Sequence, residues 1–346
     1  MPVDEIVAKL ESYMAVPAVV GFEDHFMALL ADDFNFPGYT IEEHDGIIAV
    51  TKTGTKSPVV ITAHTDRHGI VVNEEGEFEY AAFYAKRNYG IPIESPESVF
   101  QKSADRYIGE AVFAYDSGGN VIWDGEVIDS SYDFDAKKVV FGIGGLGGLP
   151  SDTPIALRSV LSQEDDLVSS QIDNAASIAV ARQLVANGFD GTVLLAVEEE
   201  IANSWTHIVK YLAGHAQPTR EIIVLDTTPY DDERAIRNGL VVLRNRDAHG
   251  IFNPSLVHNL RKFCESNDIL YEMKDEFLMT KHSYLPDEER IKKLGKTELG
   301  RIVNHTDGEY NGATVQLPTT GYHTNHETTS RLALGNFYKA LEKLLI

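Results

Sequence analysis

The sequence predicts an α/β fold: a mostly parallel sheet sandwiched by helices, with a small β-barrel domain inserted into it. On both sides of a central segment of the 346-residue chain, apolar strands without polar alternation occur together with helical patterns, which is typical of a parallel sheet covered on both faces. From about residue 73 to about 163, short strand patterns separated by turns take over. We therefore expect a divided α/β domain, 1–72 with 164–346, and an inserted β-barrel domain, 73–163.

The elements before the insertion can be assigned in order. Residues 3–14 and 23–34 have helical periodicity. Residues 40–52 predict a hairpin that turns at Asp45-Gly46. Residues 58–64 are a continuous apolar run and predict a strand buried on both faces. Within the insertion the strands are expected at 110–115, 121–129 and 137–145, with little helical periodicity around them.

After the insertion, strands and helices alternate again. The expected elements are a helix rich in small residues at 174–188, a strand at 192–197, a helix at 204–215, a strand at 221–226, a helix at 254–267 and a final amphipathic helix. The polar stretch 275–300 predicts a helical excursion from this alternation.

Composition excludes several classes of partner. A formal net charge of −23 argues against nucleic acid and against an anionic membrane surface. Cys264 is the single cysteine, so no internal disulfide is expected, which fits a reducing, cytoplasmic compartment. The N-terminus has charges throughout and lacks the pattern of a signal peptide.

Acidic and imidazole side chains follow the predicted strands at their carboxyl ends. His64 and Asp66 end the first strand, Glu198-Glu199-Glu200 follow the strand at 192–197, and Asp226 ends the next. Ligand sites of open α/β sheets lie at this edge. Three successive glutamates repel one another unless positive charge is close, and a bound metal ion would supply that charge.

Each of these residues also has an ordinary explanation when taken alone. His64 could be a surface histidine, Asp173 a cap of the helix that follows it, and Asp226 the start of an Asx turn. The glutamates could be solvated, and His323 alone is uninformative. The prediction of a metal centre rests on their joint placement.

The order of these motifs resembles that of the co-catalytic dizinc aminopeptidases, and more closely the TET-type (tetrahedral) aminopeptidases, which include glutamyl and deblocking aminopeptidases. The motifs are Val20-Gly21-Phe22-Glu23, His64-Thr65-Asp66, Asp173 before a helix of small residues, Glu199-Glu200, Asp226 and a late His323. The resemblance spans nearly the whole chain and implies a zinc-exopeptidase-like fold.

The resemblance implies a site with two divalent metal ions per chain, zinc first, with cobalt or manganese as alternatives. One ion would be held by His64, Asp173 and Asp226, and the other by Asp173, Glu200 and His323, with Asp173 bridging. Glu199 would be the general base and Asp66 would orient His64. A slip of one residue along the glutamates would make Glu198 the base.

Three segments depart from the family pattern: Arg67-His68-Gly69, Asn174-Ala175 and His323-Thr324-Asn325. The family usually has Glu-Ile-Gly at the first of them. We expect His68 and His326 in the pocket wall rather than among the ligands. Arg67, Arg244 and Arg246 would favour acidic substrates if they lay in the pocket, but the sequence does not place them there.

The resemblance implies a metal-dependent aminopeptidase that acts on short peptides and assembles as a homo-oligomer, up to a twelve-subunit tetrahedron. Two alternatives remain open. One is a metal-dependent deacylase or amidase acting on small N-acyl compounds, and the other is a non-catalytic oligomeric scaffold. The intact set of expected ligands and base disfavours the scaffold.

Overall fold

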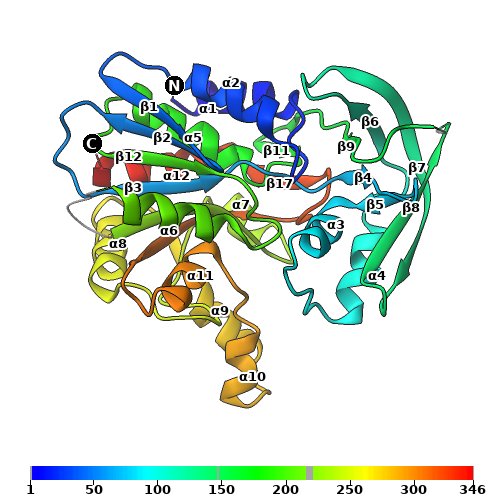
Figure 1. The fold of residues 1–346 in the computed structure, drawn as a ribbon. Coiled ribbons are helices and arrows are strands. Elements are labelled where there is room, and N and C mark those ends of the chain that lie inside the picture. Colours follow the sequence, from blue (N-terminus) through cyan, green and yellow to red (C-terminus); the bar gives the residue numbers. More distant parts are fainter. Residues whose placement is uncertain (1, 146–147, 216–220, 346) are drawn as a thin grey trace.

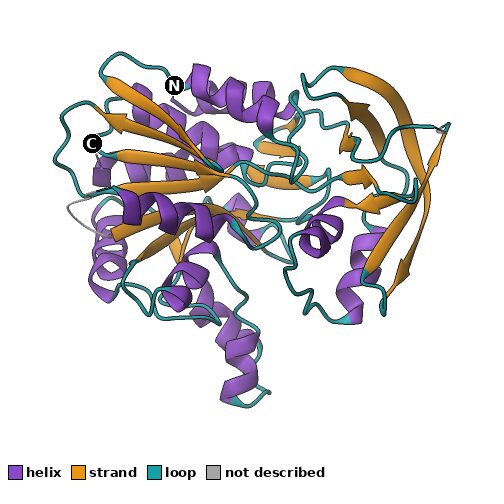
Figure 2. Ribbon diagram, viewed as in Figure 1, coloured by secondary structure: helices purple, strands orange, loops and turns teal. Residues whose placement is uncertain are grey.

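The computed structural model describes residues 2–145, 148–215 and 221–345 and contains one large sheet with a parallel centre (Figures 1 and 2). The strand order is β1-β2-β12-β3-β13-β16-β14-β15. Their bounds are Tyr39–His44 (β1), Ile47–Lys52 (β2), Val60–His64 (β3), Thr192–Ala196 (β12), Glu221–Pro229 (β13), Val241–Leu243 (β14), Tyr271–Met273 (β15) and Asn311–Thr319 (β16). The centre of the sheet consists of four adjacent strands, β12, β3, β13 and β16, which run parallel to one another. Their carboxyl ends therefore meet at one edge of the sheet.

Helices cover both faces of the sheet, as predicted, and Figure 1 shows α1 and α5 above it and α6 and α11 below it. The helices of the α/β part are α1 (Pro2–Met14), α2 (Asp24–Asp33), α5 (Ala175–Ala186), α6 (Ser204–Gly214), α7 (Arg234–Arg237), α8 (Pro254–Ser266), α9 (Lys274–Lys281), α10 (Asp287–Lys292), α11 (Glu298–His305) and α12 (Arg331–Leu345). Alanine-rich α5 is buried along nearly its whole length, because small side chains allow it to lie close to β3 and β13.

A closed barrel joins β4-β5-β8-β7-β6-β9 beside the large sheet, at the right of Figure 1. Its strands are β4 (Ile70–Val72), β5 (Phe78–Tyr80), β6 (Ala111–Tyr115), β7 (Val121–Asp133), β8 (Lys138–Gly144) and β9 (Pro154–Leu157). It has a hydrophobic core of its own, built around side chains such as Phe100, Tyr107 and Phe141. A separate three-stranded sheet joins β10 (Ser162–Glu164), β11 (Leu167–Ser170) and β17 (Glu327–Ser330).

The expected fold class, α/β with an inserted β-barrel, is confirmed, but one detail of the insertion is wrong. It contains two helices, α3 (Ala81–Asn88) and α4 (Glu97–Asp105). The first five residues of α3 are all buried, so this helix has no exposed stripe and its sequence lacks helical periodicity. Among the helices of the described residues, none is long and apolar enough to cross a membrane.

Candidate metal centre

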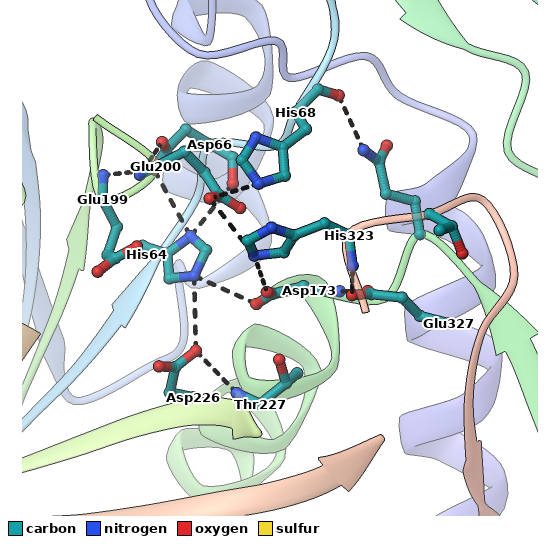
Figure 3. Close-up of polar contacts among 12 residues, drawn as sticks. His64, Asp66, His68, Asp173, Glu199, Glu200, Asp226, Thr227, His323 and Glu327 are labelled. Atoms are coloured by element: carbon teal, nitrogen blue, oxygen red, sulfur yellow. Dashed lines mark hydrogen bonds and ion pairs between the residues drawn. The ribbon is translucent and has the colours of Figure 1, made fainter. Parts of the chain in front are cut away.

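The expected site residues meet at the carboxyl edge of the parallel strands (Figure 3). His64 ends β3, Asp226 lies near the end of β13, and Glu199 and Glu200 follow β12. His323 lies in the segment after β16, which is the fourth strand of the parallel group. Asp173 precedes α5, whose N-cap is Asn174, so Asp173 is not the cap that its position alone suggested.

The first group of facing side chains is His64, Asp173 and Asp226. His64 Nε2 lies 3.3 Å from Asp173 Oδ1 and 3.7 Å from Asp226 Oδ1. On the other side of its ring, Nδ1 lies 3.1 Å from the backbone oxygen of Asp66 and 3.5 Å from Asp66 Oδ1. An Nδ1–H that donates to this backbone carbonyl leaves the Nε2 lone pair directed at the two carboxylates.

The second group is His68, Glu200 and His323. Glu200 Oε2 lies 2.7 Å from His68 Nε2 and 3.7 Å from His323 Nε2. The second oxygen of Asp173, Oδ2, lies 3.6 Å from His323 Nε2. Asp173 therefore presents one oxygen to each group, which is the arrangement of a bridging carboxylate.

Two buried carboxylates hold the backbone around the centre. Asp66 accepts hydrogen bonds from the backbone N–H groups of Glu199 and Glu200, each at 2.9 Å. Glu327 accepts from the backbone N–H groups of Asp173, at 2.9 Å, and of His323. Asp66 thus touches His64 mainly through its backbone oxygen and uses its carboxylate to fix the turn that carries the glutamates.

The three successive glutamates point in different directions. Glu198 accepts from the side chains of His207, at 2.9 Å, and Asn203, away from both groups. Glu199 forms an ion pair with Arg301 of α11 at 2.5 Å. Glu200 alone among the three lies in one of the two groups.

Buried negative charge dominates the electrostatics of this edge. Burial and the charge of Asp173 raise the pKa of Glu200 well above its usual range. Burial raises the pKa of Glu199 to about 7, against the opposing effect of Arg301. Burial acts to lower the pKa of His64, but the facing carboxylates of Asp173, Asp226 and Asp66 outweigh it and raise that pKa well above its usual range.

Apart from the close His64–Asp173 and His68–Glu200 contacts given above, several buried atoms of the two groups make no hydrogen bond within the described part of the chain. They are Asp173 Oδ1, Glu200 Oε1 and His68 Nε2. Leaving such atoms buried and unpaired costs free energy. Carboxylates and imidazoles with unpaired donor atoms aimed at a common space fit divalent cations such as zinc.

A cavity of about 490 Å³ opens onto the centre and is lined by Glu199, Glu200, Asp226 and His323. Eight lysine or arginine side chains line the same cavity, although the chain carries a net charge of −23. Two of them, Arg244 and Lys274, are buried, and their hydrogen bonds go to neutral oxygens of Gln316, Leu294, Thr228 and Pro229. Burial and the neighbouring Arg244 lower the pKa of Lys274 to about 7.

The remaining side chains singled out in the sequence lie elsewhere. Arg67 is buried against the Phe26 ring and donates to the Val16 oxygen, and Arg246 lies outside the lining of the cavity. His326 is exposed and lies 2.8 Å from Glu110, also outside the lining. A third group that could hold a metal, Glu42, His44 and His215, lies on the surface at β1 and the end of α6.

The comparisons with known proteins agree with this architecture. Residues 152–283 match the family model of the M42 glutamyl aminopeptidases. This range contains Asp173, Glu199, Glu200 and Asp226, but not His64 or His323. A comparison with curated proteins finds no match.

Solved structures of aminopeptidases share the fold over nearly the whole chain. An aminopeptidase of the archaeon Desulfurococcus kamchatkensis superimposes with a TM-score of 0.73 at 13% identity, covering 99% of this chain and 95% of that one. A TET aminopeptidase of a Thaumarchaeota archaeon from marine sediment gives 0.71 at 15% identity, covering 99% and 96%. The TET1 peptidase of Pyrococcus horikoshii, which can assemble into a tetrahedron or a large octahedral shell, gives 0.68 at 17% identity, covering 99% of both chains. The resemblance to the TET-type family is therefore confirmed, in fold by these structures and in sequence, over residues 152–283, by the family model.

Proposed function

We propose that this protein is a metal-dependent aminopeptidase that removes N-terminal residues from short peptides. The observation that carries the proposal is the convergence of two metal-capable groups at the carboxyl edge of four neighbouring strands, linked through Asp173. The similarity to the M42 glutamyl aminopeptidase model supports the same activity. In this proposal residues 1–72 and 164–346 form the catalytic domain, apart from the barrel strand β4 at Ile70–Val72, and residues 73–163 serve assembly and substrate access.

His64, Asp173 and Asp226 would hold one divalent ion, and Asp173, Glu200 and His323 would hold the other. Zinc fits this donor set, and cobalt or manganese are alternatives. Two such ions, when bound, polarise a peptide carbonyl and lower the pKa of a bound water.

Glu199 is the general base in this mechanism. It lines the cavity beside the centre, and its pKa of about 7 allows it to accept a proton near neutral pH and to return it to the leaving amine. Arg301 holds this carboxylate in place. The contacts of Glu198 with His207 and Asn203 support the assignment of Glu199 as base and Glu200 as ligand.

The cationic lining supports a preference for acidic N-terminal residues. Arg244 and Lys274 are buried beside Asp226 and the cavity, and their hydrogen-bonding partners are neutral. A substrate carboxylate that enters the cavity would gain charge-assisted hydrogen bonds there. The size of the cavity, about 490 Å³, suits a few residues of an extended peptide rather than a folded protein.

We further propose that the protein is a cytoplasmic homo-oligomer of up to twelve subunits, arranged as a tetrahedron. The fold similarity to a TET1 peptidase that forms shells supports this assembly. So do the exposed apolar side chains of the barrel strand β7, Val121, Ile122 and Ile128.

A metal-dependent deacylase or amidase is the second candidate, and the same cations favour it. The free carboxylate of an N-acyl amino acid is also an anion of suitable size for Arg244 and Lys274. The two candidates differ in the group next to the scissile bond: an aminopeptidase needs a free N-terminal amine, and a deacylase cleaves a blocked one.

The test is hydrolysis of Glu-, Asp-, Ala- and Leu-p-nitroanilide and of N-acetylglutamate, with added zinc or cobalt and with EDTA. We expect metal-dependent release from the aminoacyl p-nitroanilides, fastest for Glu and Asp. Glu199→Gln should lower kcat by about 10²–10⁴-fold while keeping its metal content, whereas Glu198→Gln stays active. Cleavage of N-acetylglutamate alone would favour the deacylase, and no cleavage with no bound metal would favour the scaffold.

A further inference from the structure

We propose that His68 is a ligand of the second metal ion, a role that rests on the metal centre of the proposed function. The residue occupies a position where the resembled family usually has isoleucine, so the proposal concerns a feature of this chain. His68 Nε2 lies 2.7 Å from Glu200 Oε2, and the His68 and His323 ring centroids are 4.0 Å apart (Figure 3).

His68 and Glu200 are in close contact, and both side chains are nearly fully buried. His68 Nε2 is buried and makes no hydrogen bond within the described residues, although Glu200 Oε2 is 2.7 Å away. Glu200 Oε1 is likewise buried without a hydrogen bond. One candidate ligand atom from each of His68, Glu200 and His323 lies within 4.8 Å of the other two, so a single cation among them would satisfy buried polar atoms of this group.

The other ring nitrogen is held as metal-bound imidazoles usually are. His68 Nδ1 lies 2.7 Å from the Tyr80 hydroxyl oxygen, which also accepts a hydrogen bond from Arg106 at 3.1 Å. The backbone oxygen of His68 accepts from Gln171 at 2.8 Å, so the main chain is fixed as well. An Nδ1–H that donates to Tyr80 leaves the Nε2 lone pair for the ion.

With His68 included, the two ions have unequal surroundings. The second ion has four protein donor groups, Asp173, Glu200, His323 and His68, whereas the first has three, His64, Asp173 and Asp226. Four protein ligands close a zinc site, and three leave a position for water or substrate. In this arrangement the second ion is the more tightly bound of the two and has a positioning role. Exchangeable ligands, such as water or substrate, bind at the first ion.

The alternative is that His68 is pocket wall and only supports Glu200. A count of coordinating imidazoles separates the two roles, because each cobalt-bound imidazole contributes one strongly shifted, exchangeable ring N–H signal to the proton NMR spectrum. The protein for this experiment carries His44→Gln and His215→Gln, so that the surface group with Glu42 adds no signal.

With cobalt bound at both sites, confirmed by elemental analysis, we expect three shifted signals, from His64, His68 and His323. His68→Ile should leave two and should weaken binding of one ion by more than the roughly 10–100-fold that loss of a merely supporting residue causes. The matched control His326→Gln should keep three. Two signals from the protein that retains His68, with two cobalt ions bound, would overturn the role of His68 alone. Failure to retain cobalt would overturn both this role and the metal centre.

Discussion

The Asp66→Asn variant tests how residues at the carboxyl edge of the sheet position the side chains of the metal centre. The Asp66 side chain is fully buried, and its two oxygens accept the backbone N–H groups of Glu199 and Glu200. Asparagine has the same shape but offers one oxygen, and its NH₂ group would face an N–H donor. One charge-assisted hydrogen bond is lost and the other becomes neutral.

The magnitude follows from these contacts. Hydrogen bonds to charged groups contribute about 1.5–3 kcal/mol each, so we expect the metal-free protein to lose roughly 2–4 kcal/mol of unfolding free energy. The turn that carries Glu200 would also lose its anchor. Loss of a residue that orients ligands typically weakens metal binding by about 10–100-fold, which corresponds to about 1.4–2.7 kcal/mol.

The assay is zinc competition against a chromophoric chelator, with urea unfolding of the metal-free protein in parallel. Asp33→Asn is the control, because Asp33 accepts hydrogen bonds from Tyr13, Lys9 and Arg182 within the helical layer. It should lower stability without changing zinc affinity. The reasoning is refuted if folded Asp66→Asn binds zinc as tightly as the wild type, or if Asp33→Asn weakens zinc binding equally.

Three further predictions concern the surroundings of the centre. Arg301→Gln removes a charge that lowers the pKa of Glu199, so the acid limb of the kcat/KM profile should move up by about 1–3 pH units; an unmoved limb would exclude this pairing. Lys274→Met should lower kcat/KM for Glu-p-nitroanilide roughly 30-fold, which corresponds to about 2 kcal/mol of lost binding free energy in the transition state. The same variant should leave kcat/KM for Leu-p-nitroanilide nearly unchanged; equal losses on both substrates would contradict a role in recognising the anion. Because the pKa of Lys274 is about 7, the wild-type KM for the Glu substrate should rise as pH increases through 7, and Lys274→Met should abolish that rise. Tyr80→Phe should weaken binding of one of the two ions by about 10–100-fold, measured by chelator competition; unchanged affinity would show that Tyr80 does not orient His68.

The strand ends were predictable because hydrophobic runs identify buried strands and parallel strands share a carboxyl edge. His64, the three glutamates 198–200 and Asp226 end or follow such runs, so the sequence alone indicated that these strand ends meet. Only the resemblance to a family singled out Glu200 among the glutamates. His323 lies in a turn without a periodic pattern, and only the resemblance to a family pointed to it. Its position is fixed by Glu327, which accepts its backbone N–H.

Contacts between distant segments could not be predicted. Arg301 reaches Glu199 across about a hundred residues of sequence. It lies in α11, which begins at the end of the polar stretch 275–300 and was not predicted as a separate helix. His68 was visible as a departure from the family pattern, but its partners Tyr80 and Arg106 come from the inserted segment. The lysine and arginine residues that line the cavity are dispersed along the chain. The net charge of −23 gives no indication that they gather at one site.

The most direct test of the central claim is a zinc anomalous-scattering map of crystals grown with zinc. The account predicts two strong peaks in the cavity, one between His64, Asp173 and Asp226 and one between Asp173, Glu200 and His323. Zinc peaks only at other sites, such as the surface group of Glu42, His44 and His215, would contradict it.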